Sequence, residues 1–233
     1  GIFNEENASG EKAERIKLVK DEPISASTEV PTTIAKDSIT YQIFYVVSGA
    51  KYRYFYWNNP SSVETNKNDW TKAGNMYYLN ENYLNSLENS NLIENMKYYL
   101  GGLKNENGTL KEIYAMERDE NNILENNQAT WNGKIALLYP SDFGYAATPN
   151  DWEDAIINNK NYNNWMLNDQ STFWFISPYA THGEVVAGWD YSHGFIWIFV
   201  NNYDALRPVL SLKSDTKILD GTGSVDNPYI LTD

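Results

Sequence analysis

Four side chains that bind metals or carry protons fall close together near the end of the chain: His182, Glu184, Asp190 and His193. A metalloprotease helix places two histidines four residues apart, with a glutamate beside the first. Here the histidines are eleven positions apart, in a stretch with several glycines that reads as strand and turn. We therefore expect structural or surface roles for these side chains rather than metal or hydrolytic chemistry.

Nucleophilic, phosphate-binding and calcium chemistry lack a motif in this sequence. No Gly-x-Ser-x-Gly elbow occurs, and neither histidine has a recognisable Ser or Asp partner. The Gly-Thr-Gly-Ser run at 221–224 has no following helix or lysine, so we interpret it as a turn. Calcium binding remains possible, but no motif supports it, because four candidate aspartates do not form an EF-hand loop: Asp142, Asp215, Asp220 and Asp226. We expect no cofactor and no enzyme activity, although a carboxylate-based glycan hydrolase stays open because sequence spacing does not give spatial spacing.

Rings and amides gather in the last third of the chain, and they support a recognition surface. On a strand, Trp189, Tyr191 and His193 would share one side and present three rings together. Rings stack on sugars or anchor protein interfaces, while asparagine amides donate and accept hydrogen bonds at once. We predict binding of a glycan or a protein through these residues: Trp189, Tyr191, His193, Asn201, Asn202 and Tyr203. The competing interpretation, that the rings only build a core, is preferred for Trp197, which lies in an apolar run.

Composition limits the class of protein and its partners. The 233 residues include 18 Tyr and 8 Trp, an aromatic content that favours sheets over helix bundles. The net charge of −13 repels nucleic acid and anionic lipid headgroups, so no nucleic-acid partner is expected. No cysteine is present, which excludes disulfides and thiolate metal sites. No apolar run reaches the length of a membrane helix, and Gly1 follows no initiator Met or signal pattern, so we expect a processed chain without membrane insertion by this segment.

The first part of the chain divides into two regions. We predict that residues 1–37 form an extended segment, with a strand at 15–20 that places Ile16 and Leu18 on one face. Such a strand could be an edge strand of the domain or be lent to a neighbouring subunit, and the sequence leaves both open. Residues 38–233 then form the globular domain. It opens with aromatic runs at 39–47 and 52–57 that flank a Ser-Gly-Ala turn at 48–50, a hairpin pattern.

The remaining elements follow from apolar spacing. Leucines and other apolar residues at spacings of three and four predict one or two amphipathic helices over 77–100, ending at Gly101-Gly102. A polar stretch to about Thr130 predicts long loops. The apolar run 133–139 predicts a buried strand ended by Pro140, and the acids after Pro149 predict a helix start. Further strands are expected at 173–176, 185–191, 195–200 and 206–212.

Several segments resemble a group of uncharacterised bacterial surface domains that often follow type IV pilin-like N-termini. They are Gly133-Lys-Ile-Ala-Leu-Leu-Tyr-Pro-Ser-Asp-Phe-Gly-Tyr-Ala146, the Asn-Asn-Trp-Met at 163–166, and Arg207-Pro-Val-Leu-Ser-Leu-Lys-Ser-Asp215 with Gly-Thr-Gly-Ser and Asn-Pro-Tyr after it. The Arg-Pro-Val-Leu strand is also similar to the C-type lectin-like fold, which is an analogy of fold. The lectin Glu-Pro-Asn and Gln-Pro-Asp triplets are absent, so the resemblance carries no calcium-dependent sugar binding. The catalytic cysteines of the related formylglycine-generating enzymes are absent too.

The sequence therefore predicts an α+β, sheet-dominated single domain of C-type lectin-like fold, with one or two amphipathic helices packed on twisted antiparallel strands. We expect it outside the cell or on its surface, working in adhesion by binding a glycan or protein. The alternative is a structural subunit of a pilus or fibre that self-associates through residues 1–37.

Overall fold

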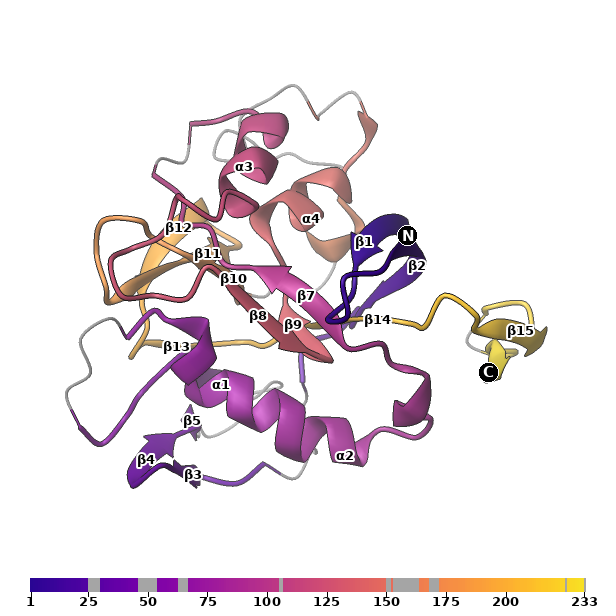
Figure 1. Cartoon of the computed structure of the whole chain (residues 1–233), viewed down its shortest axis with the longest axis horizontal. Helices are drawn as coiled ribbons and strands as arrows, with labels where there is room; N and C mark the ends of the chain where they lie inside the picture. The colour runs from indigo at the N-terminus through magenta and orange to yellow at the C-terminus, as the bar shows by residue number, and fades with distance from the viewer. Residues whose placement is uncertain are drawn as a thin grey trace.

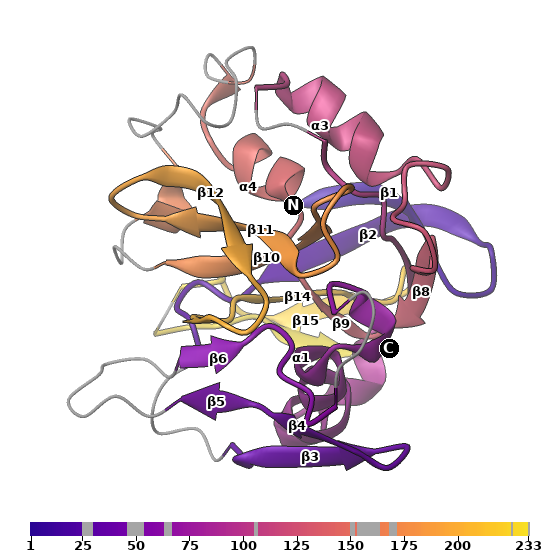
Figure 2. The ribbon, with the colours of Figure 1, turned by 90° about the vertical axis from the view of Figure 1, so that its left-hand side faces the viewer.

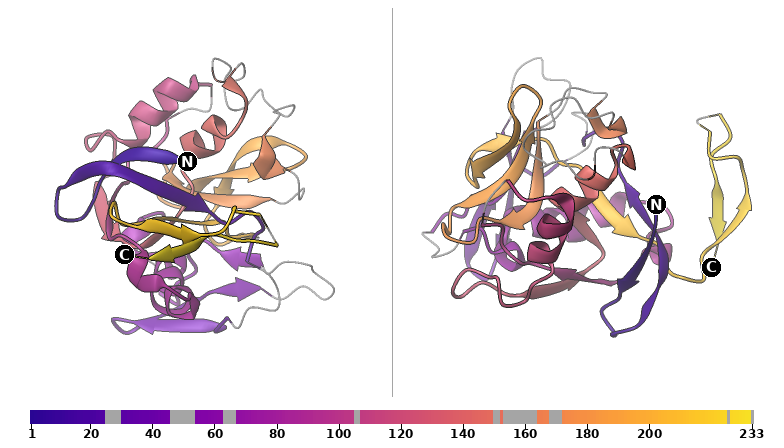
Figure 3. Two further views of the ribbon diagram at one scale, coloured as in Figure 1. Left: turned by 90° about the vertical axis from the view of Figure 1, so that its right-hand side faces the viewer. Right: turned by 90° about the horizontal axis from the view of Figure 1, so that it is seen from above.

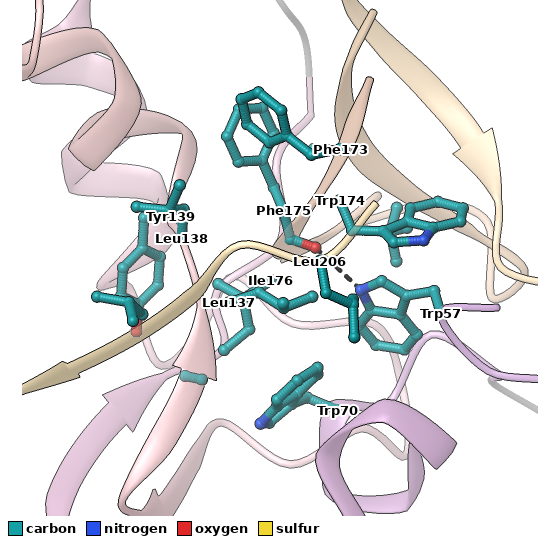
Figure 4. Close-up of a cluster of buried hydrophobic side chains, with 14 of the residues drawn as sticks. Trp57, Trp70, Leu137, Leu138, Tyr139, Phe173, Trp174, Phe175, Ile176 and Leu206 are labelled. Carbon is teal, nitrogen blue, oxygen red and sulfur yellow. Dashed lines mark hydrogen bonds between the residues drawn. The ribbon is translucent and has the colours of Figure 1, made fainter. Parts of the chain in front are cut away.

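Four tryptophans form the centre of the core and join its layers. Each is at most 1% exposed: Trp57, Trp70, Trp174 and Trp189. In the computed structural model the indole of Trp57 donates a hydrogen bond to the carbonyl of Phe175 at 2.9 Å (Figure 4). The indole of Trp174 donates to the carbonyl of Phe55 at 2.8 Å. Because Trp57 and Phe55 lie far in sequence from Trp174 and Phe175, this reciprocal pair fixes two distant segments side by side.

The structure describes residues 1–24, 30–45, 54–62, 67–104, 107–149, 152, 164–167, 172–224 and 226–232. It is rich in sheet, with 39% strand and 19% helix, which confirms the predicted α+β class (Figure 1). The largest sheet has the order β1-β2-β14-β9, with all neighbours antiparallel. Its strands are β1 (Ile2–Glu6), β2 (Lys12–Val19), β14 (Pro208–Ser211) and β9 (Ile135–Leu137). Strands from both ends of the chain therefore meet in one sheet.

Two three-stranded antiparallel sheets lie beside each other in Figure 2. One has the order β10-β11-β12 and contains β10 (Phe173–Pro178), β11 (Val185–Asp190) and β12 (Gly194–Phe199). The other has the order β13-β6-β5 and contains β13 (Tyr203–Asp204), β6 (Tyr54–Tyr56) and β5 (Phe44–Tyr45). The antiparallel pairing of β5 with β6 confirms that the two aromatic runs pair, while the turn predicted at 48–50 lies outside the described residues.

Three two-stranded pairs complete the sheet structure. They are β3 (Thr33–Lys36) with β4 (Ile39–Gln42), β7 (Met96–Tyr99) with β8 (Thr130–Gly133), and β15 (Lys217–Asp220) with β16 (Ile230–Thr232). The β15–β16 hairpin projects from the body as an arm, which Figure 3 shows most clearly from above. The side chains of β15 are all exposed.

The helices cover the two sides of the central strands. On one side, α1 (Gly74–Tyr77), η2 (Tyr78–Tyr83) and α2 (Leu84–Ser86) form a continuous helix, preceded by η1 (Trp70–Lys72) and followed by η3 (Ser90–Leu92). On the other side lie α3 (Leu110–Glu117) and α4 (Pro140–Tyr145), with η6 (Trp165–Leu167) further along (Figure 1). No helix among the described residues is long and apolar enough to cross a membrane.

One prediction from apolar spacing is wrong and one helix was not predicted, and each has a local reason. Residues 92–100 were expected to be helical, but Met96–Tyr99 form β7, in which Met96 and Tyr98 are more buried than their neighbours. In this segment the same apolar residues fit both the two-residue spacing of a strand and the four-residue spacing of a helix. Pairing with β8 makes the segment a strand. The stretch to about Thr130 was expected to contain long loops, and it also contains α3, which begins after a capping box at Thr109. The hydroxyl of Thr109 accepts from the Glu112 amide, and the Glu112 carboxylate accepts from the Thr109 amide.

The strands and the helix start expected elsewhere have mixed outcomes. Strands β9, β10, β11, β12 and β14 confirm the predicted strands at 133–139, 173–176, 185–191, 195–200 and 206–212. β9 ends at Leu137, before Pro140, and Pro140 begins α4, a helix that was not predicted. The helix start predicted after Pro149 falls largely on residues 150, 151 and 153–163, outside the described residues.

Strand β2 has the predicted location but turns its charged side inward. Ile16 and Leu18 share a face, as expected, yet that face is the outer one, and Leu18 is 42% exposed. Arg15 and Lys17 point the other way and are buried. β2 lies between β1 and β14, so within residues 1–37 the open edge of this sheet belongs to β1.

The capping box gives a stability prediction. Replacing Thr109 with Ala removes the side-chain acceptor of the Glu112 amide, which costs about 1 kcal/mol of unfolding free energy. In a domain of this size that loss corresponds to a fall in Tm of about 2–4 °C, measurable by thermal unfolding. Thr109→Ser keeps the hydroxyl and serves as the matched control. Equal stability of the two variants would contradict a role for the cap.

Candidate functional site

Four tyrosines form an exposed cluster on the β13-β6-β5 sheet. The rings of Tyr45 and Tyr203 stack with their centroids 4.6 Å apart and an angle of 21° between planes. Tyr54 and Tyr56 meet Tyr203 edge-on, at 6.0 and 6.3 Å. Tyr45 is 43% exposed and Tyr203 is 47% exposed. We call Tyr45, Tyr54, Tyr56 and Tyr203 the tyrosine platform.

Strand pairing explains why these four rings lie on one face. Tyr45 lies opposite Tyr54, and Tyr203 lies opposite Tyr56. Successive side chains of a strand point to opposite faces, so the neighbouring residues face the interior. Those neighbours are buried and pair with each other: Phe44, Phe55 and Asp204. The buried side of this small sheet therefore determines that the tyrosines point outward.

The phenol groups of the platform supply hydrogen-bonding groups beside the ring faces. Partial desolvation, together with the neighbouring Tyr45 and Tyr203, raises the pKa of Tyr56 above its ordinary value. A neutral phenol both donates and accepts a hydrogen bond. Asn201 and Asn202, in the turn that leads into β13, are exposed and add amide groups next to Tyr203 in the chain. The platform thus combines ring faces with uncharged hydrogen-bonding groups.

Of the residues predicted to form a binding surface, the structure places some on the surface and one in the core. The exposed positions of Tyr203, Asn201 and Asn202 agree with the expectation of an outward-facing surface. The expectation for Trp189 is wrong, because its ring is 1% exposed and lies 4.5 Å from that of Phe143. Trp189 is a core residue, and it does not join two other rings on a surface.

Tyr191 and His193 are exposed, but they lie apart from the platform. Both belong to the turn between β11 and β12, while Asn201 and Tyr203 follow the other end of β12. A six-residue strand spans about 20 Å at the usual rise per residue. The two ends of β12 therefore carry separate groups of exposed side chains rather than one surface.

The turn at 190–193 brings together an aspartate, a serine and a histidine, a partnership that the sequence analysis did not recognise. Oδ1 of Asp190 accepts from the amides of Ser192 and His193, both at 2.8 Å, and from the Ser192 hydroxyl at 2.6 Å. Partial burial opposes ionisation, but these hydrogen bonds lower the pKa of Asp190 to about 2. The contacts are those of a polar turn.

This turn lacks the geometry of a catalytic triad. In a triad, one ring nitrogen of the histidine contacts the serine and the other contacts the aspartate. Here the Ser192 hydroxyl and the Asp190 carboxylate both lie 2.8 Å from the same atom, Nδ1 of His193. The ring cannot pass a proton between the two groups through separate nitrogens.

A second candidate is a hollow of about 350 Å³ between β1, β7 and α3. The guanidinium of Arg118 lies 4.0 Å from the ring centroid of Tyr114 and 4.1 Å from that of Tyr139. Lys97 lines the same hollow and lies 3.4 Å from Glu6 and 3.2 Å from Glu120. We call it the Arg118 pocket. The charges that border it are already matched within the chain, and the Arg118 cation occupies ring faces of both tyrosines.

The carboxylate of Glu117 lies behind this pocket and is fully buried. Its oxygens accept from the amide and hydroxyl of Ser141 and from the Arg118 guanidinium. Burial raises the pKa of Glu117 to about 7, although Arg118 and Ser141 act in the opposite direction. Glu117 does not line the pocket, so it positions Arg118 and the start of α4 rather than meeting a ligand.

The described residues contain no cluster of side chains suited to binding a metal ion. Across the described residues, no three His, Asp or Glu side chains gather as a metal ion would require. Of the aspartates considered for calcium, Asp142 contacts Lys17 at 2.9 Å. A carboxylate with a lysine at this distance is matched in charge without an ion.

Comparison with known proteins gives no family for this chain. No protein-family model matches it, and no curated protein and no solved structure is significantly similar to it. Function therefore has to be inferred from the residues themselves.

Tyr45, Tyr54 and Tyr56 were not identified as site residues from the sequence. They lie about 150 residues before Tyr203, and only the pairing of β6 with β13 brings them together. The available signal was the aromatic run around 54–56, in which Tyr alternates with Phe. Period-two alternation of a polar and an apolar ring predicts one face outward.

The aspartate beneath the platform gives a pH prediction. Burial raises the pKa of Asp204 to about 8, opposed by the Ala205 amide and supported by the charge of Asp190. In the unfolded chain an aspartate titrates near 3.9, so between about pH 4 and 8 the folded state holds the extra proton. The stability that Asp204 contributes is fully present below its pKa in the unfolded chain. It is lost as the pH rises through its pKa in the folded state.

We therefore expect Asp204→Asn to remove part of the fall in Tm between pH 5 and pH 8.5. The difference between the variant and the wild type isolates Asp204, because Glu117 contributes in the same pH range in both. Asp215→Asn, at an exposed aspartate, is the matched control and should leave the profile unchanged. Parallel profiles for Asp204→Asn and wild type would show that Asp204 ionises normally.

Proposed function

We propose that this chain is a binding domain that recognises a neutral glycan through the tyrosine platform and the amides of Asn201 and Asn202. The observation that carries the proposal is the half-exposed ring of Tyr203, stacked on Tyr45 and bordered by two further tyrosines. Nearly half of the surface of each stacked residue is exposed, 47% for Tyr203 and 43% for Tyr45.

The chemistry of the platform suits a sugar. A pyranose presents C–H groups on its faces and hydroxyls around its rim, so it needs an aromatic face and nearby donors and acceptors. Tyrosine provides both at a low cost in side-chain entropy, since it has two rotatable bonds. The net charge of −13 disfavours an acidic saccharide, and this favours a neutral one.

The cellular setting is part of the proposal and rests on other support. We propose display outside the cell or at its surface, in adhesion, because of the resemblance of the 133–146 and 207–215 segments to bacterial surface domains. A C-type lectin-like fold remains a prediction from the same resemblance. Recognition by contact, with no bond made or broken, is consistent with the platform's neutral side chains.

Substitution of the platform tests this proposal directly. Tyr203→Ala and Tyr45→Ala should each weaken glycan binding about tenfold, the equivalent of about 1.4 kcal/mol for a lost stacking partner. Retention on a glycan array identifies the ligand, and titration calorimetry then gives the affinities. Tyr191→Ala is a matched control, since Tyr191 is 49% exposed but lies beyond the other end of β12.

A further variant separates the platform from the Arg118 pocket. Tyr114 is 47% exposed and lines the pocket. Binding that is lost in Tyr114→Ala and retained in Tyr203→Ala would place the ligand in the pocket and reject the platform. Retention of a protein instead of a glycan, with the same dependence on Tyr203, would correct the class of ligand.

A second function, self-assembly, is favoured by the projecting β15–β16 arm. It exposes large apolar side chains that the rest of the chain does not cover: Ile218, Leu219, Tyr229 and Ile230. An isolated two-stranded hairpin is only marginally stable in water, so a covering partner would stabilise it. The outer face of the β1–β2 hairpin is apolar at one end, with Ile2 69% and Leu18 42% exposed, and we propose that the arm of a second copy packs there.

Sedimentation experiments, which measure the average mass in solution, test self-assembly. We expect the average mass of the wild type to rise with concentration, and Leu219→Ser together with Ile230→Ser to abolish the rise. A matched pair of changes away from the arm, Tyr114→Ser and Tyr191→Ser, should leave it intact. A wild type that remains a monomer at high concentration would reject self-assembly through the arm.

A further inference from the structure

A buried lysine contacts two partly buried carboxylates where the first hairpin meets α4. The side chain of Lys17 is 5% exposed. Its Nζ atom lies 2.9 Å from Oε1 of Glu5 and 2.9 Å from Oδ2 of Asp142. The other Asp142 oxygen is 3.2 Å away, so the amine faces the whole carboxyl group.

The fold holds all three groups in place. Lys17 lies on β2, Glu5 on the paired strand β1, and Asp142 in the first turn of α4. The second oxygen of Glu5 accepts from the Ser211 hydroxyl at 2.9 Å, and Oδ2 of Asp142 accepts from the Tyr139 amide at 3.4 Å. Reacting groups fixed at contact distance gain a large effective concentration.

Two rings flank the lysine amine. Nζ of Lys17 lies 5.5 Å from the ring centroid of Phe3 and 5.4 Å from that of Tyr139. Two negative charges face one positive charge there, in a region of low dielectric where unbalanced charge is costly. Condensation removes one charge of each sign, so the Lys17–Asp142 ion pair no longer has to be held out of water, while the Glu5 carboxylate keeps the Ser211 hydroxyl as its hydrogen-bond donor.

We propose that Lys17 and Asp142 condense to form an intramolecular isopeptide bond, with Glu5 as the proton carrier. The Nζ–Cγ bond forms, and one Cγ–O bond of Asp142 breaks. The ammonium and the carboxylate together yield a neutral amide and one water, so atoms and charge balance without an oxidant or a further reactant.

Glu5 moves the protons in this reaction. It accepts a proton from the Lys17 ammonium, which frees the lone pair for attack on Cγ, and it returns protons to the departing oxygen. Burial acts against the charged lysine, but Asp142 and Glu5 raise the pKa of Lys17 overall. Before the reaction the side chain is therefore an ammonium, which is why an adjacent base is needed.

The surroundings provide an exit for the water. Lys17 and Asp142 border a hollow of about 280 Å³ that also contacts Leu18, Tyr145 and Trp165. The bond would join positions that are 125 residues apart, in a chain that has no cysteine. Closing so long a loop restricts the unfolded chain as a disulfide does.

The mass of the intact, denatured protein tests the proposal. We expect the purified full chain to be lighter than its sequence by the mass of one water, and tandem mass spectrometry should place the loss in a peptide that links Lys17 to Asp142. Lys17→Arg, Asp142→Ala and Glu5→Gln should each have the full sequence mass. Glu5→Gln keeps the shape of the side chain but cannot carry the proton.

Lys97 offers a matched control within the same chain. It also faces two carboxylates, those of Glu6 and Glu120, but its side chain is 24% exposed. Lys97→Arg should therefore still lose one water. A folded wild type that retains its full sequence mass after prolonged incubation would reject the bond. This measurement needs no variant to fold, and a bond that persists in Glu5→Gln would reject the role of Glu5.

Discussion

Two buried cations on β2, Arg15 and Lys17, determine how several distant segments pack against this strand. A charge inside a protein must be paired, so each partner has to come from a defined place. Arg15 donates to the Glu5 carbonyl at 2.8 Å and pairs with Glu11 at 2.9 Å, which aligns β1 on β2. Glu94 at 3.7 Å brings in the segment before β7, and Asp142 brings in α4 through Lys17. One strand with its charges turned inward thus draws together four parts of the chain.

This inversion limits what the sequence can predict. Alternation of Ile16 and Leu18 with charged residues locates β2, but it carries no information on which face is buried. The usual assumption, apolar side inward, is wrong here, because the acids that match Arg15 and Lys17 come from distant segments. Predictions that need only local sequence are more accurate. The strands β9 to β12 and β14 follow from apolar runs alone. The missed helix α3 had a readable signal, since Thr109 and Glu112 have the spacing of a capping box.

The candidate site could be predicted only in part, for a related reason. Exposure of Tyr203 follows from its place beside a turn, whereas its neighbours Tyr45, Tyr54 and Tyr56 depend on the pairing of β6 with β13. The error at Trp189 has a simple cause. Two-residue periodicity holds only within a strand, and β11 ends at Asp190, so the burial of Trp189 says nothing about the turn that follows. The end of a secondary-structure element is the feature least reliably predicted from a sequence. Here the end of β11 determines which of the predicted site residues are exposed.

The two crossed indole bonds of the core have a mechanical consequence. Trp57 follows β6 directly and binds β10, while Trp174 belongs to β10 and binds β6. A load applied at the outer tyrosines is therefore carried into β10 through two connections. A layer that looks peripheral in the fold is in this way attached to the interior at two points.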